Sequence, residues 1–252
     1  MDTDQERSLA GRCALITGAA RRVGAAIARR LHAAGADVAI HYRGSVAEAR
    51  ALAAELNRQR SGSAQAFQAE LGELAQLSAL VDAVGAWSGR LDILVNNASV
   101  FYPTPLGTVT AAQWDDLMNS NLKAPLFLSQ AAMPLLRAAN GAIVNIVDIH
   151  ARRPLSGHAV YGAAKAGLSM LTRALAKDLA PAVRVNGIAP GAILWPENGL
   201  TDAAKRSILQ QVPLGRAGDP EDIASCALYL VRDAGYVTGQ VISVDGGRSI
   251  GW

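Results

Sequence analysis

The chain has 252 residues, of which 50% are hydrophobic and 18% charged, and its formal net charge is +3. This composition excludes a disordered chain, and basic residues are too few and too scattered for a nucleic-acid-binding protein. Cys13 and Cys226 lie too far apart for a disulfide framework or a metal knuckle, and no run of about 18 apolar residues predicts a membrane span. The polar N-terminus is unlike a signal peptide, so we expect a cytoplasmic protein without a metal.

Strand-like and helix-like segments alternate along the chain. The expected strands are 13–17, 37–41, 64–71, 91–96, 142–148, 183–188 and 240–244, and the expected helices are 22–34, 45–60, 73–86, 110–139, 161–179 and one from about 220. Ser45 is a candidate helix cap, and Pro125 and Pro134 predict breaks in the fourth helix.

The expected strands are continuously apolar, which is typical of a parallel sheet covered on both faces. We therefore predict an α/β protein with a Rossmann-type, doubly wound, seven-stranded parallel sheet in a three-layer αβα sandwich. Residues 1–252 would form a single dinucleotide-binding catalytic domain, with a substrate flap around 190–220.

The segment TGAARRVG (17–24) follows the first strand and opens the first helix. Glycine lets the backbone approach a pyrophosphate closely, and the helix N-terminus offers free N–H groups at that point. The segment predicts a dinucleotide site, and a plain tight turn is the alternative.

The segment HYRGS (41–45) ends the second strand and indicates which dinucleotide binds. An acidic residue here would bind the ribose of NAD, whereas basic residues accept the 2′-phosphate of NADP. No carboxylate occurs before Glu48, and Arg22, Arg43 and Ser45 can donate to a phosphate. We predict NADP(H), although both arginines could instead be solvated surface residues.

Tyr161 and Lys165 are four residues apart on an expected helix, so they share one face. A free tyrosine is a poor acid–base group at neutral pH, but a nearby ammonium favours the phenolate and lowers the pKa of the phenol. The pair follows the fifth strand, at the carboxyl edge where such sheets bind ligands.

With these segments the chain resembles the short-chain dehydrogenase/reductase family over nearly its full length. The residues that carry the resemblance are Gly18, Gly24, Asn96-Asn97-Ala98, Asn121, Tyr161, Lys165 and Pro190-Gly191. The resemblance implies that Tyr161 donates a proton, that Lys165 modifies its pKa and binds the ribose, and that Asn121 anchors a relay water.

Two positions depart from the common family pattern: Arg22 stands where glycine is usual, and Asp148 stands where serine is usual. An ionised carboxylate cannot donate to a ketone oxygen and would repel the developing oxyanion, but it suits a nitrogen heterocycle. Both departures, with the segments TGAARRVG, HYRGS and NNASVFYPTPL (96–106), resemble the pteridine reductases. In that subgroup an aromatic ring at the position of Phe101 stacks on the pterin.

The resemblance implies a set of site residues for an NADPH-dependent reductase of dihydropterins, and of dihydrofolate or oxidised pterins, assembled as a homotetramer. The catalytic residues would be Asp148, Tyr161, Lys165 and Asn121. The cofactor NADP(H) would bind Gly18, Arg21, Arg22, Val23, Gly24, His41, Tyr42, Arg43, Ser45, Glu70, Leu71, Asn97, Ala98, Ser99, Tyr161, Lys165, Pro190, Gly191 and Ile193. The substrate would bind Arg22, Ser99, Phe101, Asp148, Tyr161, Gly191, Leu194 and Trp195.

Two other functions remain open: a general NADP-dependent carbonyl or quinone reductase, and a non-catalytic NADP-binding regulator. Of the other candidates, His150 or His158 could line the site. We expect His32 to be a surface residue and Trp87 and Trp114 to be structural.

Overall fold

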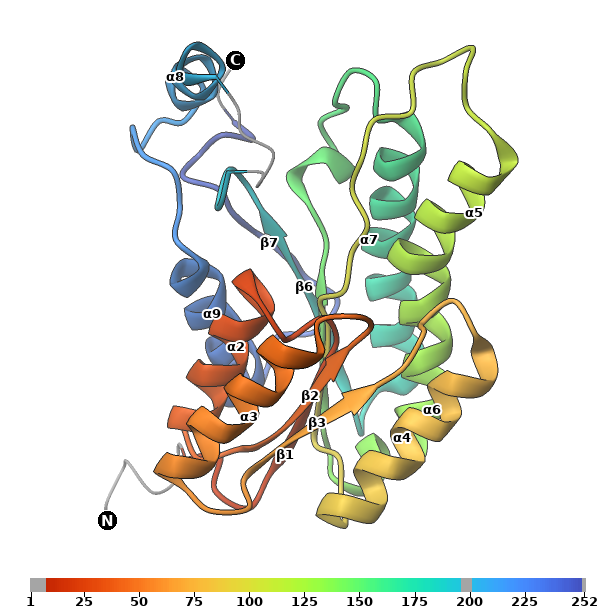
Figure 1. Ribbon diagram of the computed structural model, residues 1–252, viewed down its shortest axis with the longest axis vertical. Coiled ribbons are helices and arrows are strands. Elements are labelled where there is room, and N and C mark those ends of the chain that lie inside the picture. Colours follow the sequence, from red (N-terminus) through yellow and green to blue (C-terminus); the bar gives the residue numbers. More distant parts are fainter. Residues whose placement is uncertain (1–7, 196–200, 251–252) are drawn as a thin grey trace.

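The computed structural model describes residues 8–195 and 201–250, which contain one seven-stranded sheet (Figure 1). Its strands are β1 (Cys13–Ile16), β2 (Asp37–Tyr42), β3 (Ala64–Gln68), β4 (Ile93–Asn96), β5 (Ala142–Ile146), β6 (Arg184–Pro190) and β7 (Val241–Val244). All neighbouring strands pair in parallel, in the order β3-β2-β1-β4-β5-β6-β7. The strand order reverses between β1 and β4, which is where sheets of this kind bind ligands.

Helices cover both faces of the sheet (Figure 1). One face carries α2 (Arg22–Ala33), α3 (Val46–Gln59) and α9 (Pro220–Leu228), and the other carries α4 (Leu74–Ser88), α6 (Ala124–Ala138) and α7 (Ala159–Leu179). Each face of the sheet has its own hydrophobic core, and alternate strand residues point into one or the other. Ala14 and Ile16 of β1 pack with the first set of helices, and Cys13 and Leu15 pack with the second. The predicted doubly wound α/β fold is confirmed.

The predicted helix over 110–139 consists of three pieces, with its irregular part earlier than we expected. Helix α5 (Ala111–Met118) runs into a π-helical turn, η1 (Asn119–Lys123), which continues into α6. Pro125 lies in the first turn of α6, where its missing N–H costs no helical bond, and Pro134 lies inside α6 without ending it. The break therefore comes from the π-turn and not from a proline.

Three other expectations need adjustment. Ser45 directly precedes α3, but its side chain makes no capping hydrogen bond, so the cap prediction is wrong. The third strand ends at Gln68, which leaves Glu70 and Leu71 in the following loop. The segment predicted as a flap contains helix α8 (Asp202–Gln210), and its residues 196–200 lie outside the described residues.

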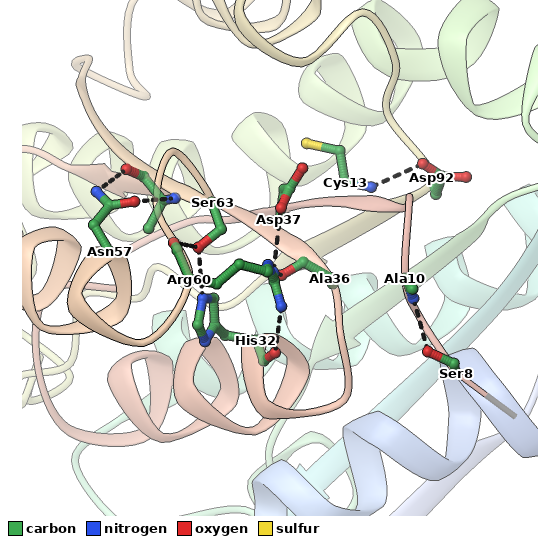
Figure 2. A network of polar contacts seen from close by, with 11 residues as sticks. Ser8, Ala10, Cys13, His32, Ala36, Asp37, Asn57, Arg60, Ser63 and Asp92 are labelled. Atoms are coloured by element: carbon green, nitrogen blue, oxygen red, sulfur yellow. Dashed lines mark hydrogen bonds and ion pairs between the residues drawn. The ribbon is translucent and has the colours of Figure 1, made fainter. Parts of the chain in front are cut away.

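The amino-terminal edge of the sheet holds a network of polar side chains (Figure 2). The Arg60 guanidinium donates to the carbonyls of His32 and Ala36 and to the Asp37 carboxylate, which lies 3.2 Å away. The His32 ring contacts the Ser63 hydroxyl at 2.7 Å and is only 3% exposed. The prediction of a surface histidine is therefore wrong, because α2 turns this ring toward the start of β3.

Candidate active site

The carboxyl edge of the sheet carries a cavity of about 650 Å³ at the point where the strand order reverses. Its walls come from the loops that follow β1, β2, β3 and β4. Most of the predicted cofactor residues line it, namely Gly18, Arg21, Arg22, Val23, Gly24, His41, Tyr42, Arg43, Ser45, Glu70, Leu71, Asn97, Ala98 and Ser99. The volume is in the range usual for sites that bind a small molecule or a cofactor.

The turn between β1 and α2 packs so closely on its neighbours that it needs glycine. Gly18 has a φ of +61°, and a Cβ on Gly24 would collide with the Gly18 carbonyl oxygen. Neither position tolerates a side chain easily. The Asn97 amide donates to the carbonyls of Thr17 and Gly18 at 2.8 and 3.1 Å. Asn97, predicted as a cofactor contact, thus uses its amide to hold the turn.

His41 clamps the same turn from β2. Its Nδ1 accepts from the Gly18 N–H at 3.1 Å, so Nε2 carries the proton and donates to the Ala69 carbonyl at 3.1 Å. The ring is 1% exposed, and burial lowers the pKa of His41 to about 4. The imidazole is therefore neutral at pH 7, and the described bonds give its ring a supporting role beneath the turn.

Arg22 opens α2 in a left-handed conformation, with a φ of +54°. This conformation costs a non-glycine residue about 1 kcal/mol, which explains why glycine suits the position in other chains. Its Nη2 donates to the Trp195 carbonyl at 3.3 Å. Arg22 therefore connects the turn after β1 to the segment after β6, which contains the predicted substrate residues Leu194 and Trp195.

Two arginines stand at the rim of the cavity, each beside a carboxylate. Arg21 Nη1 lies 3.8 Å from Glu48 Oε1, and Arg43 Nε lies 3.9 Å from Glu70 Oε2. All four side chains are partly exposed, so these pairs are weak and a bound phosphate can displace the carboxylates. Ser45, free of a capping bond, adds a hydroxyl to the same rim.

Asp148 and Tyr161 meet at the end of β5. The Tyr161 hydroxyl donates to Asp148 Oδ2 at 2.7 Å, and the His150 N–H donates to Asp148 Oδ1 at 2.8 Å. Lys165 is 2% exposed; its Nζ donates to the Ile146 carbonyl at 2.9 Å and lies 5.7 Å from the centre of the Tyr161 ring. The carboxylate and the phenol therefore present adjacent oxygens with one proton between them.

The electrostatics of this group differ from the sequence-based expectation. Burial, followed by the Asp148 carboxylate, raises the pKa of Tyr161 well above its ordinary value. Burial also lowers the pKa of Lys165 to about 8, against the opposing effect of Asp148. The expected net lowering of the Tyr161 pKa is wrong here, because burial and the Asp148 carboxylate both raise it. The phenol is consequently protonated and able to donate.

Asn121 lies in the π-turn η1, and its side chain is fully hydrogen bonded. Its Nδ2 donates to the carbonyls of Val100 and Leu117, both at 2.9 Å, and its Oδ1 accepts from the Ser99 hydroxyl at 2.7 Å. Such π-turns frequently occur at functional sites. Any relay water at this residue would have to use its backbone or share the Oδ1 atom.

An aromatic wall stands beside the phenol. Phe101 is 50% exposed, and its ring stacks on His158 with centroids 4.7 Å apart and planes at 13°. Its edge meets Tyr161 at 4.8 Å and 79°. The Phe101 ring therefore contacts both His158 and Tyr161, and half of its surface is left open.

The remaining predicted residues after β6 do not line this cavity. Gly191 packs against the Asp245 backbone, Ile193 lies in the core, and Leu194 is 39% exposed. Trp87 packs on Phe67 as a structural residue, whereas Trp114 is 47% exposed and its structural role stays a prediction.

Several residues of the site were not predicted. Asp116, Asn119 and Ser120 line the cavity from α5 and η1, and the Asp148 and Asp245 carboxylates act electrostatically on Arg248. In the sequence these residues lie in an ordinary polar helix or near the C-terminus, where no motif marks them.

Within residues 8–195 and 201–250, no cluster of His, Cys, Asp or Glu is arranged to hold a metal ion. Over the same ranges, every helix is too short or too polar to cross a bilayer.

Comparison with known proteins assigns this chain to a family. A family model described as "Enoyl-(Acyl carrier protein) reductase" matches residues 18–249. The chain belongs to the short-chain dehydrogenase/reductase family. As a member of this family it is an oxidoreductase, as the sequence predicted.

Relatives within this family carry different names at nearly the same distance. Pteridine reductase 1 of Leishmania tarentolae is 38% identical, over 94% of this chain and 96% of its own length. The 3-oxoacyl-(acyl-carrier-protein) reductase FabG of Staphylococcus aureus is 37% identical, over 93% and 96%. The crystal structure of a blue fluorescent protein from a metagenomic library in complex with NADPH has a TM-score of 0.90 and 36% identity, over 96% and 99%. Overall similarity does not choose among these activities, so the choice depends on the site.

Proposed function

We propose that this short-chain dehydrogenase/reductase is an NADPH-dependent pterin reductase that converts dihydropterins to tetrahydropterins, and accepts dihydrofolate and oxidised pterins. The observation that carries the proposal is the 2.7 Å hydrogen bond from Tyr161 to Asp148 at the end of β5. A carboxylate at this place favours a substrate that has N–H groups to donate. The similarity to a pteridine reductase supports the same assignment.

The residues of the cavity fit NADP(H), which is the cofactor that the sequence predicted. Glycine is needed in the turn, because a Cβ on Gly24 would collide with the Gly18 carbonyl, and the turn lines the cavity beside the opening of α2. Arg21 and Arg43, with the Ser45 hydroxyl, stand at the rim where the 2′-phosphate would bind. When bound, NADPH supplies the hydride for the reduction.

The chain's own residues supply and hold the proton. The buried Tyr161 phenol is protonated because burial and Asp148 raise its pKa, so it can donate to the ring nitrogen next to the reduced carbon. Lys165, with Nζ 5.7 Å from the phenol ring, favours the phenolate that remains. Asp148 accepts from pterin N–H or amino groups and takes part in delivery of the proton.

The rim of the site supplies the contacts that orient a flat ring. The Phe101 ring is half exposed and stacks on the His158 ring, which fixes its orientation. A pterin can therefore stack on the exposed part of Phe101. Arg22, bonded to the Trp195 carbonyl, can donate to the polar edge of the pterin. Ser99, Gly191 and Leu194 complete the proposed substrate contacts.

A carbonyl reductase is the second candidate, and the close similarity to FabG favours it. In that case Asp148 would hold the proton that it shares with Tyr161 and would donate to a ketone oxygen, as the usual serine does. A non-catalytic regulator would not need the Tyr161 phenol, the Lys165 ammonium and the Asn121 amide together, so their presence argues against this function.

The assay compares substrates in the presence of NADPH. The purified protein should oxidise NADPH with dihydrobiopterin or dihydrofolate and should be slow with a panel of ketones and quinones. Rapid ketone reduction without any pterin or folate turnover would reject the proposal in favour of a carbonyl reductase. Absence of turnover with every substrate would favour the regulator.

The substitution Asp148→Ser separates the two enzymatic functions. Loss of the carboxylate should lower kcat/KM for the pterin by about a hundred-fold while the Kd for NADPH stays unchanged, because one polar contact to the reacting group is lost. Asp202→Ser, an exposed carboxylate on α8, is the matched control and should leave both unchanged.

The homotetramer implied by the family resemblance is also part of the proposal. Strand β7 is at the edge of the sheet and only partly buried, which leaves room for contact with another copy. The mass of the purified protein in sedimentation velocity should be that of four chains, and a monomer would contradict this assembly.

A further inference from the structure

We propose that Ser99 is a catalytic residue whose hydroxyl turns from Asn121 to Tyr161 when the phenol gives up its proton, and then returns a proton to it from the cavity. The inference rests on the proton-donor role of Tyr161 in the proposed function. It holds whether the reduced group is a pterin or a carbonyl.

The resting orientation of the Ser99 hydroxyl follows from its neighbour. Both N–H groups of the Asn121 amide are used, by the carbonyls of Val100 and Leu117 at 2.9 Å each. The remaining Oδ1 can only accept, so the Ser99 hydroxyl donates to it, at 2.7 Å. The phenol meanwhile donates to Asp148, so Ser99 and Tyr161 each have one proton with a defined acceptor.

After Tyr161 donates its proton, its phenolate oxygen needs a hydrogen-bond donor. The phenolic O–H bond breaks, the bond to the substrate forms, and the electron pair stays on the phenolate oxygen. This oxygen belongs to a residue only 4% exposed, where an unpartnered anion is costly. Its former acceptor, Asp148, is itself a carboxylate and has no proton to give while it is ionised.

Ser99 is the neutral donor within reach of that oxygen. Its side chain can hydrogen bond to Tyr161, and this contact favours the phenolate and acts against the other shifts of the Tyr161 pKa. The alternative cation, Lys165, already donates to the Ile146 carbonyl at 2.9 Å. A hydroxyl needs only to rotate about one bond to exchange Asn121 for the phenolate.

The same hydroxyl can return the proton. Ser99 lines the cavity and is exposed to it, so its lone pairs can accept from water there. Ser99 passes its proton to the phenolate and receives one through that water from a hydronium ion or a buffer acid. Each turnover then draws one proton from the solvent, which balances the one delivered to the substrate.

The test uses Ser99→Ala, Ser99→Thr and the control Ser156→Ala, which removes an exposed hydroxyl on another loop. Ser99→Ala should lower kcat about a hundred-fold, because it removes one donor to a developing oxyanion. The Thr variant keeps the hydroxyl and should recover most of the rate. Ser156→Ala should keep the wild-type Kd for NADPH, followed by fluorescence, and any change of this Kd in the two Ser99 variants should be far smaller than the loss of kcat in Ser99→Ala.

A titration of the phenol without cofactor gives a second, independent result. Tyrosinate absorbance, taken as the difference from Tyr161→Phe, should appear at higher pH in Ser99→Ala than in the wild-type protein. The titratable groups around the phenol, Asp148, Lys165 and His158, are the same in both proteins. Ser156→Ala should titrate like the wild type.

Any of three results overturns the proposal: an unshifted Tyr161 titration in Ser99→Ala, a Thr variant as slow as the Ala variant, or a loss that lies only in the Kd for NADPH. Failure of the pterin assignment is a separate result, because it shows in the substrate panel of the wild-type enzyme. The Ser99 variants are then measured with whichever substrate is reduced, and the titration needs no substrate.

Discussion

The two edges of the sheet hold similar side chains but use them differently. At the amino edge, the Arg60 guanidinium donates to the carbonyls of His32 and Ala36, and Asp92 accepts from the Cys13 N–H at 2.9 Å (Figure 2). At the carboxyl edge, Tyr161 and Asp148 bond to one another at 2.7 Å. The bonds at the amino edge, including the side-chain pairs Arg60–Asp37 and His32–Ser63, join elements together, whereas the Tyr161 phenol and the Asp148 carboxylate can exchange a proton.

This comparison explains why a list of chemically active residues does not define a site. His32 and His41 are both nearly fully buried histidines with lowered pKa values, one at each edge. The carboxyl edge also has a cavity of about 650 Å³, with the loops after four strands around it. The loops, rather than the residue types, make the difference between the edges.

The largest expected effect is at the phenol. Tyr161→Phe removes the proton donor and should lower kcat about a thousand-fold, within the range usual for loss of a general acid. The thermal midpoint and the Kd for NADPH should change little. Retention of near-wild-type kcat in this variant would mean that another group delivers the proton.

Acid should lower the free energy of unfolding, because the buried His41 ring under the carboxyl-edge turn is neutral in the fold. The pKa of His41 is about 4 in the fold and about 6.5 when exposed, so the unfolded chain binds more protons between these values and the free energy of unfolding falls as the pH drops from 6.5 to 4. The maximal loss is about 3 kcal/mol. The lowered pKa of His32 acts in the same direction.

Urea unfolding at several pH values measures this effect, with His41→Asn as the comparison. The variant has no imidazole to protonate, so its stability should depend less on pH over this window. An equally steep pH dependence in the variant would show that His41 is not the group responsible.

A substitution at the amino edge should affect stability alone. Arg60→Ala leaves the carbonyls of His32 and Ala36 without this donor, and should lower the free energy of unfolding by about 1–2 kcal/mol. The kcat of the folded enzyme should not change. A reduced kcat at full folding would connect the two edges and contradict their separation.

The smallest expected effect concerns the rim of the cavity. Glu48→Gln removes the carboxylate 3.8 Å from the Arg21 guanidinium, and should tighten NADPH binding about two-fold to three-fold, since exposed pairs of this kind are weak. NADH, without a 2′-phosphate, should gain less. Equal gains for both cofactors in fluorescence titrations would place Arg21 away from the phosphate.

The fold and most cavity residues could be predicted because they depend on local patterns. Apolar runs of four to seven residues make buried parallel strands, and loops after such strands meet at one edge. The TGAARRVG turn and the Tyr161–Lys165 spacing were informative for the same reason.

The features that escaped prediction depend on contacts distant in sequence. The buried His32 ring meets Ser63 from the start of β3, and the raised pKa of Tyr161 comes from its burial and then from Asp148 after β5. The role of the His41 ring beneath Gly18 depends on the pairing of β1 with β2. No spacing in one segment of the chain contains this information.

The central claim, that the Asp148 carboxyl contacts a nitrogen heterocycle, is tested most directly by a crystal structure with NADPH and a pterin. The account predicts that Asp148 and Tyr161 both lie within about 2.6–3.2 Å of polar atoms on the same pterin, with the Phe101 ring parallel to it. A pterin bound with the Asp148 carboxylate directed away from it would contradict the account.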